Sequence, residues 1–304
     1  RIRYRWDAQR PDTPLYGVAG WPVGHSLSPD IHNAGFTAIN APGVYVPLPI
    51  RPHRFAETVE ALRTCPGMHL RGLSVTIPHK EAALLYALEH AAAIDDLSRH
   101  IGVVNTLAWD NTGRLSAFNS DYAGALDALV AAWDGRRETL TGKRVAVLGA
   151  GGAARAIIAG LVHHGATVVI YNRTPEKARD LAAAFAGGTG KVVAAPWDKL
   201  PQSCCDAFIN CTPVGMHPHT AATPLEPITE GPCAWSADTV VFDTVYNPQM
   251  TRLLKLAKAA GATIVPGTEM FVRQAAIQFA EFTGVAAPVE IFRQTLGRAL
   301  SIRG

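Results

Sequence analysis

The chain has 304 residues, of which 48% are apolar and 17% charged, so it can bury a large core, and a chain of this length usually divides into two domains. With 28 basic against 25 acidic side chains, the net charge is only +3, which argues against the basic stripe of a nucleic-acid-binding protein. The apolar runs are far shorter than the ~20 residues that cross a bilayer, and no charged-then-apolar leader opens the chain, so we expect a soluble protein with no membrane partner.

Strands and helices alternate from the start of the chain. A short apolar run at 15–19 precedes a loop rich in glycine and proline, which predicts a strand that enters a loop. A helix is expected from Pro29 and further strands at 44–48 and 72–77, with helical patterns between and after them. This alternation predicts an α/β unit.

A second unit is expected after a polar stretch at 134–143. A strand at 145–148, a helix at 153–164 and a strand at 167–171 would form a β-α-β module of about thirty residues. Later strands are expected at 207–210, 240–243 and 263–265, and later helices at 251–260, 269–282 and 288–300.

The cysteines are five, an odd number, and lack the paired spacing of metal ligands. We therefore predict buried or half-buried free thiols in a reducing compartment. A disulfide framework is the alternative. The residues are Cys65, Cys204, Cys205, Cys211 and Cys233.

The motif GAGGAA at 149–154 follows a predicted strand and opens a predicted helix, the context in which G-x-G-x-x-A indicates a dinucleotide site. Gly149 permits a tight turn, Gly151 lets the backbone approach a pyrophosphate, and Ala154 keeps helix and strand close. The helix N-terminus adds N–H donors and partial positive charge. A glycine-rich turn without a ligand is the alternative. We predict a Rossmann-type doubly wound domain with cofactor contacts at Gly149, Ala150, Gly151, Gly152 and Ala153.

The end of the second strand in this module selects the cofactor. An NAD enzyme normally places Asp or Glu there, roughly 20 residues past the first glycine, to bind the ribose 2′-hydroxyl. Here Asn172, Arg173 and Thr174 occupy the place, and Lys177 follows. A carboxylate would repel a 2′-phosphate, whereas a guanidinium, a hydroxyl and an ammonium bind it, so NADP is the predicted cofactor. In the alternative, Thr174 only caps the next helix and the cations are solvated; capping is compatible with phosphate binding.

The loop GWPVGHSLSP at 20–29 supplies two hydroxyls at the start of a helix. Ser28 before Pro29 fits an N-cap followed by proline in the first turn. That role does not explain Ser26. Two serines two residues apart, together with the N–H groups of the helix end, form a cradle for a carboxylate. We assign His25 to packing or loop ordering, since no partner carboxylate marks it as a catalyst.

Two further polar groups belong to short motifs. SVTIPHK at 74–80 places Lys80 just beyond a strand, with Thr76 two residues inside it. FNSDYAG places Asp121 in a polar loop before a helix. Alone, Asp121 fits a helix cap and Lys80 a solvated surface lysine. Together they indicate acid–base chemistry.

The ordered motifs are GWPVGHSLSP, VTIPHK, GVVNT at 102–106, NSDYAG, GAGGAA with NRT at 172–174, VYNP at 245–248 and EMFVRQA at 269–275. In this order, over about 15–300, they resemble the motifs of the shikimate dehydrogenase family. The chain resembles most closely the dehydrogenase half of the bifunctional plant-type dehydroquinate dehydratase–shikimate dehydrogenases, whose linker is similar to YRWDAQRPDT at 4–13. A dehydratase part fused upstream would explain Arg1 in place of a starting Met.

The resemblance implies a role for each matching residue. Lys80 and Asp121 would be the catalytic pair. Substrate would be bound by Ser26 and Ser28 at its carboxylate, by Thr76, Asn105 and Gln274 at ring hydroxyls, and by Tyr246 near the carboxylate. Asn172, Arg173, Thr174 and Lys177 would clamp the adenosine phosphate, and the loop with Thr212, Val214 and Met216 would border the nicotinamide together with Gly267. The chain departs from the family pattern at Ser74, where many members have Asn, and at Ser120, which replaces the usual Thr.

The implied architecture is an α/β substrate domain at 1–121, completed by helices at 268–304, and an NADP domain at 122–267, with the site in the cleft between them. NADPH would pass hydride to the C3 ketone of 3-dehydroshikimate, a step toward chorismate and the aromatic amino acids, while Lys80, paired with Asp121, protonates the developing alkoxide. No metal is needed. The alternatives are a quinate or quinate/shikimate dehydrogenase using NAD and a non-catalytic metabolite sensor on the same fold. The expected location is the cytoplasm, or the plastid in a plant.

Overall fold

The computed structural model describes residues 12–133 and 135–303, which form two compact units. The first unit contains the described residues up to Ser120 together with Gln274–Arg303, and the second contains Asp121–Arg273. The chain returns to the first unit between Arg273 and Gln274, inside helix α9 (Gly267–Thr283). This boundary lies six residues after the predicted one at 267/268. Residues 1–11, which include most of the linker-like segment at 4–13, lie outside the described residues, as does Asp134. Within the described ranges, no helix combines the length and the apolar character needed to span a membrane.

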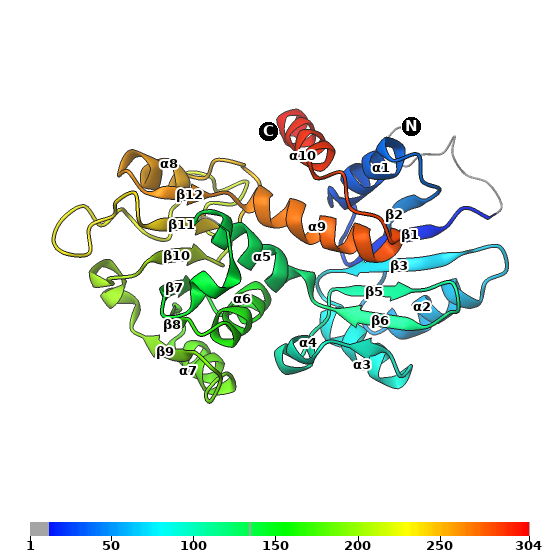
Figure 1. Cartoon of the computed structure of the whole chain (residues 1–304), viewed down its shortest axis with the longest axis horizontal. Coiled ribbons are helices and arrows are strands. Elements are labelled where there is room, and N and C mark those ends of the chain that lie inside the picture. Colours follow the sequence, from blue (N-terminus) through cyan, green and yellow to red (C-terminus); the bar gives the residue numbers. More distant parts are fainter. Residues whose placement is uncertain (1–11, 134, 304) are drawn as a thin grey trace. The chain divides into compact units, whose positions relative to one another are not determined.

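The first unit is built on a mixed sheet with strand order β2-β1-β3-β5-β6-β4 (Figure 1). Its strands are β1 (Leu15–Gly20), β2 (Val44–Pro49), β3 (Leu70–Val75), β4 (Ala93–Ile94), β5 (Thr106–Trp109) and β6 (Leu115–Phe118). Its helices are α1 (Ser28–Ala38), α2 (Phe55–Thr64), α3 (Lys80–Glu89), α4 (Asp96–Ile101), the later part of α9 and α10 (Val289–Arg303). β1, β2 and β3 are parallel, whereas β5 is antiparallel to both β3 and β6. The carboxyl ends of β1, β3 and β6 therefore share one edge with the amino end of β5.

Two details of this sheet differ from the sequence prediction. β3 ends at Val75, so Thr76 lies just outside the strand and not inside it. The strand ends there because its partners end: β5 begins opposite Ser74, and the pairing with β1 stops at Val75. The hairpin β5–β6 was not predicted. Its turn is held by Asp110, whose carboxylate accepts the backbone N–H of Thr112 (2.8 Å) and of Arg114 (2.9 Å).

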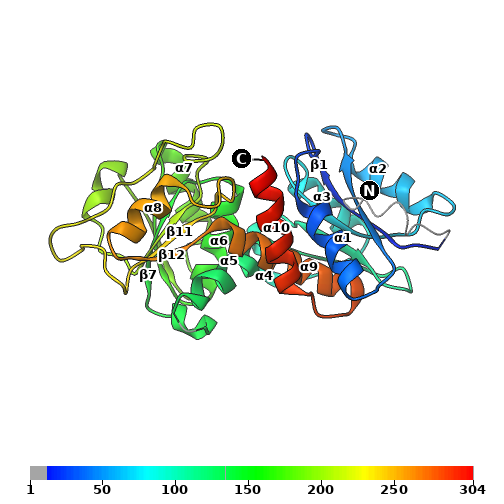
Figure 2. The same ribbon diagram turned by 90° about the horizontal axis from the view of Figure 1, so that it is seen from above.

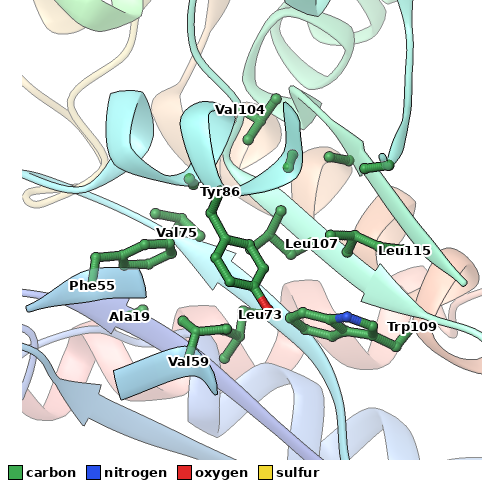
Figure 3. Close-up of a cluster of buried hydrophobic side chains, with 14 of the residues drawn as sticks. Ala19, Phe55, Val59, Leu73, Val75, Tyr86, Val104, Leu107, Trp109 and Leu115 are labelled. Atoms are coloured by element: carbon green, nitrogen blue, oxygen red, sulfur yellow. The ribbon is translucent and has the colours of Figure 1, made fainter. Parts of the chain in front are cut away.

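Apolar side chains cover both faces of the first sheet. On one face, Tyr86 of α3 meets the rings of Phe55 and Trp109 edge-on in a buried cluster (Figure 3). On the other face, Gly72 of β3 lies against the Phe282 ring of α9, and a Cβ at Gly72 would be 2.4 Å from that ring. α1 and α10 lie side by side over this face (Figures 1 and 2). The edge shared by the ends of β1, β3 and β6 and the start of β5 therefore belongs to a sheet that is packed on both faces.

The second unit contains six parallel strands in the order β12-β11-β10-β7-β8-β9. They are β7 (Arg144–Leu148), β8 (Thr167–Tyr171), β9 (Lys191–Ala195), β10 (Ala207–Asn210), β11 (Val240–Asp243) and β12 (Thr263–Val265). The helices are α5 (Ser120–Ala131), α6 (Gly152–His163), α7 (Pro175–Ala184) and α8 (Arg252–Ala259), with 3-10 helices at Arg137–Leu140 and Trp197–Gln202. This is the Rossmann order, in which the chain changes direction across the sheet between β7 and β10. The predicted bounds of β8, β10, β11 and β12 are confirmed to the residue.

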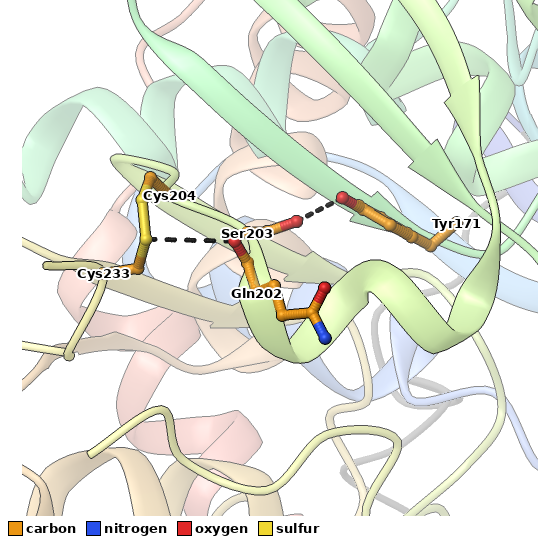
Figure 4. The surroundings of a disulfide bond; sticks show 5 residues. All are labelled: Tyr171, Gln202, Ser203, Cys204 and Cys233. Carbon is orange, nitrogen blue, oxygen red and sulfur yellow. Dashed lines mark hydrogen bonds between the residues drawn. A yellow bond between two sulfur atoms is a disulfide. The ribbon is translucent and has the colours of Figure 1, made fainter. Parts of the chain in front are cut away.

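The prediction that all the cysteines are free buried or half-buried thiols is wrong. Cys204 and Cys233 form a disulfide with a Cα–Cα distance of 4.6 Å (Figure 4). It joins the residues before β10 to the long connection that precedes β11. Cys65 is a free thiol but exposed, while Cys205 and Cys211 are free and half-buried. The pairing depends on two loops meeting in space, which the spacing of 29 residues does not reveal.

Candidate active site

The predicted substrate residues of the first unit gather at the edge of its sheet defined above. Ser26 and Ser28 follow β1, Thr76 and Lys80 follow β3, and Asn105 immediately precedes β5. The antiparallel course of β5 is what brings Asn105 to the same edge as the ends of the parallel strands. Segments far apart in sequence therefore contribute to one polar edge.

Ser26 and Ser28 are in contact. The Ser26 hydroxyl donates to Ser28 Oγ (3.2 Å), and Ser28 N donates to Ser26 Oγ (3.2 Å). The predicted N-cap role of Ser28 is wrong, because Leu27 is the N-cap and Ser28 is the first residue of α1. No side chain caps this helix. The two hydroxyls and the helix N-terminus are thus arranged as an anion cradle would require.

Lys80 is the half-buried first residue of α3. Its carbonyl oxygen accepts from Val104 N (3.3 Å). The preceding His79 is buried at the N-cap, with Nε2 at 2.7 Å from Ile50 O and its ring stacked on Phe55. His79 therefore anchors the backbone that carries Lys80. The sequence analysis missed this role, because the partner carbonyl lies 29 residues away.

Asn105 is buried and ties the sheet to the start of α5. Its Oδ1 accepts from Ser120 N (2.7 Å) and from Thr106 Oγ1 (2.9 Å), and its Nδ2 donates to Ser120 Oγ (3.0 Å). The predicted polar loop around Asp121 is therefore wrong: Ser120 already begins α5, and the buried Asp121 lies in its first turn. A helix N-terminus favours a carboxylate at that place.

Gln274 is half-buried on α9, in the part that belongs to the first unit. One turn later, the buried Gln278 accepts from Ser74 Oγ (2.7 Å) and donates to Thr106 Oγ1 (3.0 Å). The sequence analysis missed Gln278, because nothing in a helical pattern distinguishes a glutamine that faces a sheet from one that faces solvent.

The glycine loop lies between β7 and α6, at the carboxyl edge of the second sheet. Gly149 has φ +109°, and a Cβ there would lie 3.1 Å from Cys211 O, so the turn itself requires glycine. Gly151 differs, because its φ of −88° suits any residue and an added Cβ would meet nothing within 4 Å. α6 also has no side-chain cap and no acidic residue in its first turn. These features fit a ligand that approaches the backbone and the helix N-terminus, as a pyrophosphate does.

The segment after β8 lies beside this loop, because β7 and β8 pair in parallel. Asn172 Nδ2 donates to Thr174 O (2.8 Å) and closes the turn. Thr174 is the N-cap of α7, as predicted, but its side chain makes no capping hydrogen bond. Arg173 and Lys177 are exposed, and neither forms an ion pair with any residue that the structure describes. Their charges are available to a phosphate.

The loop after β10 carries Thr212, Val214 and Met216 and is fixed by the buried Asn210. The Oδ1 atom of Asn210 accepts from Thr212 N (2.9 Å) and Oγ1 (2.6 Å), and its Nδ2 donates to Val214 O (3.2 Å). Nδ2 also donates to Asp243 Oδ1 (2.9 Å). Burial raises the pKa of Asp243, and the hydrogen bonds that its carboxylate accepts oppose this rise. The sequence analysis missed Asn210 and Asp243, which hold the loop and need not touch a ligand.

Tyr246 follows β11, and Gly267 follows β12. The Tyr246 ring packs against Phe271, with centroids 4.9 Å apart. A Cβ at Gly267 would lie 2.5 Å from Val245 O, so only glycine allows α9 to begin there. Because all strands of this sheet are parallel, the predicted cofactor residues share its carboxyl edge.

The described residues thus form two polar edges, one in each unit. Ser26, Ser28, Thr76, Lys80 and Asn105 belong to the first unit, and the predicted cofactor residues to the second. Tyr246 and Asp121, which the resemblance places with the substrate, are also assigned to the second unit.

Three family models match successive parts of the chain. The shikimate dehydrogenase substrate-binding domain matches residues 18–107, the shikimate/quinate 5-dehydrogenase model matches 134–213, and the shikimate 5′-dehydrogenase C-terminal domain matches 267–296. The first model covers Ser26, Ser28, Thr76, Lys80 and Asn105, and the second covers the glycine loop and the segment after β8.

Individual proteins match over nearly the whole chain. The NADP(+) shikimate dehydrogenase of Methanothermobacter thermautotrophicus is 40% identical over 95% of this chain and 98% of its own length. The chloroplastic bifunctional 3-dehydroquinate dehydratase/shikimate dehydrogenase of Arabidopsis thaliana is 38% identical over 95% of this chain, which spans 47% of that longer protein.

Solved structures of shikimate dehydrogenases have a similar fold. A shikimate dehydrogenase in complex with NADP+ has a TM-score of 0.81 at 32% identity, over 96% of this chain and 97% of that one. The shikimate 5-dehydrogenase of Thermus thermophilus, in complex with NADP(H) and shikimate, has a TM-score of 0.77 at 32% identity, over 95% of this chain and all of that one. The chain belongs to the shikimate dehydrogenase family.

Proposed function

We propose that this chain is an NADP-dependent shikimate dehydrogenase, which reversibly reduces the C3 ketone of 3-dehydroshikimate to the alcohol of shikimate. The observation that carries the proposal is the similarity, over nearly the whole of both chains, to a relative named for this activity and cofactor. The polar edges of the two units support it independently, since each offers the groups that one of the two ligands needs.

The second unit fits NADP. The open N-terminus of α6 and the bare backbone at Gly151 would hold the pyrophosphate. Arg173, Thr174 and Lys177 would hold the 2′-phosphate, where an NAD enzyme would carry an acidic residue. When bound, the nicotinamide supplies the hydride that the ketone carbon accepts.

The chain's own groups would bind the substrate and move the proton. Ser26 and Ser28 would hold the carboxylate at the start of α1, and Asn105 a ring hydroxyl. As the carbonyl oxygen gains negative charge, the Lys80 ammonium would stabilise it and deliver its proton, and in the oxidation direction it would take that proton back. Asp121 would pair with the Lys80 ammonium and orient it. Lys80 is the single lysine in 1–120 and 274–304, so no other ammonium of the first unit could replace it.

Steady-state rates for shikimate and quinate, each with NADP and with NAD, test the proposal. The expected result is a kcat/KM for shikimate with NADP that exceeds the other three combinations. A preference for quinate with NAD would instead identify a quinate dehydrogenase. Binding of shikimate without turnover under any of these conditions would identify a metabolite sensor.

The proposal extends to the surroundings of the enzyme. One relative joins this activity to a dehydratase in a single longer protein, and we propose the same fusion upstream of this chain. The location would be the plastid in a plant and the cytoplasm elsewhere. The coding sequence upstream of Arg1 tests both statements, because it would encode a dehydroquinate dehydratase and, in a plant, a transit peptide before it.

A further inference from the structure

The substrate edge of the first unit contains a buried chain of hydrogen bonds that no role assigned above uses. It starts at Tyr45 of β2, whose hydroxyl donates to Ser74 Oγ (2.6 Å). Ser74 Oγ donates to Gln278 Oε1 (2.7 Å), and Gln278 Nε2 donates to Thr106 Oγ1 (3.0 Å). Thr106 Oγ1 donates to Asn105 Oδ1 (2.9 Å). All five side chains are buried.

The direction of these bonds fixes the side-chain amide of Asn105. Its Oδ1 is occupied by donors from Thr106 and Ser120. Its Nδ2 uses one hydrogen on Ser120 Oγ, and an amide nitrogen carries two. Within the described part of the chain, Asn105 therefore has a donor left for a ligand and no accessible acceptor. A ring hydroxyl held by Asn105 would be held through its oxygen.

The other end of this hydrogen-bond chain lies against α1, the helix that begins at Ser28. Three contacts fix Tyr45 itself. Its ring stacks on that of His32, with centroids 4.3 Å apart. The Asn33 side chain accepts from the backbone N of Tyr45 (2.8 Å) and donates to its backbone O (2.8 Å). Burial raises the pKa of Tyr45 far above its ordinary value, so the hydroxyl keeps its proton.

We propose that Tyr45 is a positioning residue of the substrate site, which fixes the orientation of the Asn105 side chain through Ser74, Gln278 and Thr106. Its hydroxyl begins the hydrogen-bond chain that orients Asn105, expected at a ring hydroxyl, and its backbone is bonded to Asn33 of α1. A buried, fully bonded network of this kind favours one arrangement of its members. The inference rests on the proposed function, because it names the part of shikimate that Asn105 would hold.

The test is Tyr45→Phe, which removes the hydroxyl and keeps the ring. We expect the KM for shikimate to rise about five- to thirtyfold, the range for one lost buried hydrogen bond, with the KM for NADP within about twofold of wild type. Tyr16→Phe is the matched control: Tyr16 is also a buried tyrosine of this unit, but its hydroxyl donates to Phe282 O, outside the network. The control should leave both KM values unchanged.

Ser74→Ala breaks the same chain at its second member and serves if Tyr45→Phe does not fold. Combined with Tyr45→Phe, it should add little to the larger single effect, since both changes disconnect Asn105. An unchanged KM for shikimate in a folded variant, equal rises in both KM values, or multiplicative losses in the double variant would overturn the positioning role while the wild-type activity stands. A wild type without activity on shikimate would overturn the proposed function itself.

Discussion

Lys80 and Asp121 occupy first turns of two different helices, and each position suits its charge differently. The N-terminus of α5 stabilises the Asp121 carboxylate, whereas the N-terminus of α3 disfavours the Lys80 ammonium. A negative partner would offset this unfavourable interaction and orient the ammonium toward a developing alkoxide. This is why the two residues are proposed to act as one unit.

Lys80→Ala should lower kcat by ~10²- to 10⁴-fold, the usual contribution of an acid–base or electrostatic group, with little change in the KM for shikimate or NADP. Asp121→Asn should be impaired as well. The double variant should lose much less than the product of the two single losses. Multiplicative losses would show independent action, and near-normal kcat in folded Lys80→Ala would reopen His25 or Tyr246 as the proton donor.

Arg173→Ala should weaken NADP binding about ten- to a hundredfold and leave NAD binding almost unchanged, because only NADP carries the phosphate that a charge-assisted contact would hold. Arg179→Ala is the control on α7, the helix that follows Arg173: Arg179 is exposed and already paired with Glu176 at 2.7 Å. Titration of each variant with both cofactors decides the matter. Equal losses for NADP and NAD would place the phosphate elsewhere.

Sequence motifs mark candidate ligand contacts more readily than the residues that fix those contacts in place. Lys80 and Arg173 stand in recognisable motifs beside a strand or a helix start. His79, Asn210 and Gln278 have partners that only the folded chain brings near, so no local pattern marks them.

The start of α6 is the element on which cofactor binding is proposed to depend most. Gly151→Ala places a methyl group where the fold has room but a pyrophosphate would approach. NADP and NAD should therefore weaken alike, with a melting temperature close to wild type. Gly267→Ala is the contrasting variant, since its Cβ would lie 2.5 Å from Val245 O and should lower the melting temperature. Unchanged cofactor affinity in Gly151→Ala would remove the pyrophosphate from this loop.

Four parallel strands of the second unit, β8, β10, β11 and β12, were predictable to the residue, because they are short apolar runs between clear turn signals, as at Val240–Asp243. β9 was not predicted, and its residues are exposed or half-buried. The first unit was harder. The end of β3 is set by where its neighbours stop, and the hairpin β5–β6 is short and carries a polar turn at 110–113. The Asp-Asn-Thr-Gly sequence of that turn is nevertheless typical of a hairpin.

At the scale of the whole chain, one buried group links stability to pH. His32 lies among aromatic rings, and among the residues that the structure describes neither of its ring nitrogens has a hydrogen-bond partner. Burial lowers its pKa from 6.5 to about 3. Between these values the unfolded chain binds the proton and the folded chain does not. Stability from this residue is therefore complete above pH 6.5 and decreases as the pH falls toward 3, by about 1.4 kcal/mol per pH unit.

His32→Phe should remove this contribution, so that between pH 6.5 and 5 the variant loses about 1.5 to 2 kcal/mol less unfolding free energy than wild type. His219→Gln, a change at an exposed histidine, should keep the wild-type dependence. Denaturant titrations at several pH values measure the slopes. Parallel slopes for wild type and His32→Phe would show that His32 protonates in the folded state.

In the proposed reaction, hydride moves between C3 of shikimate and NADP. Oxidation of shikimate labelled with deuterium at C3, with NADP as acceptor and mass analysis of both products, follows this hydride. The expected products are unlabelled 3-dehydroshikimate and NADPH that carries one deuterium. Deuterium released to water, or no 3-dehydroshikimate at all, would contradict the proposed reaction.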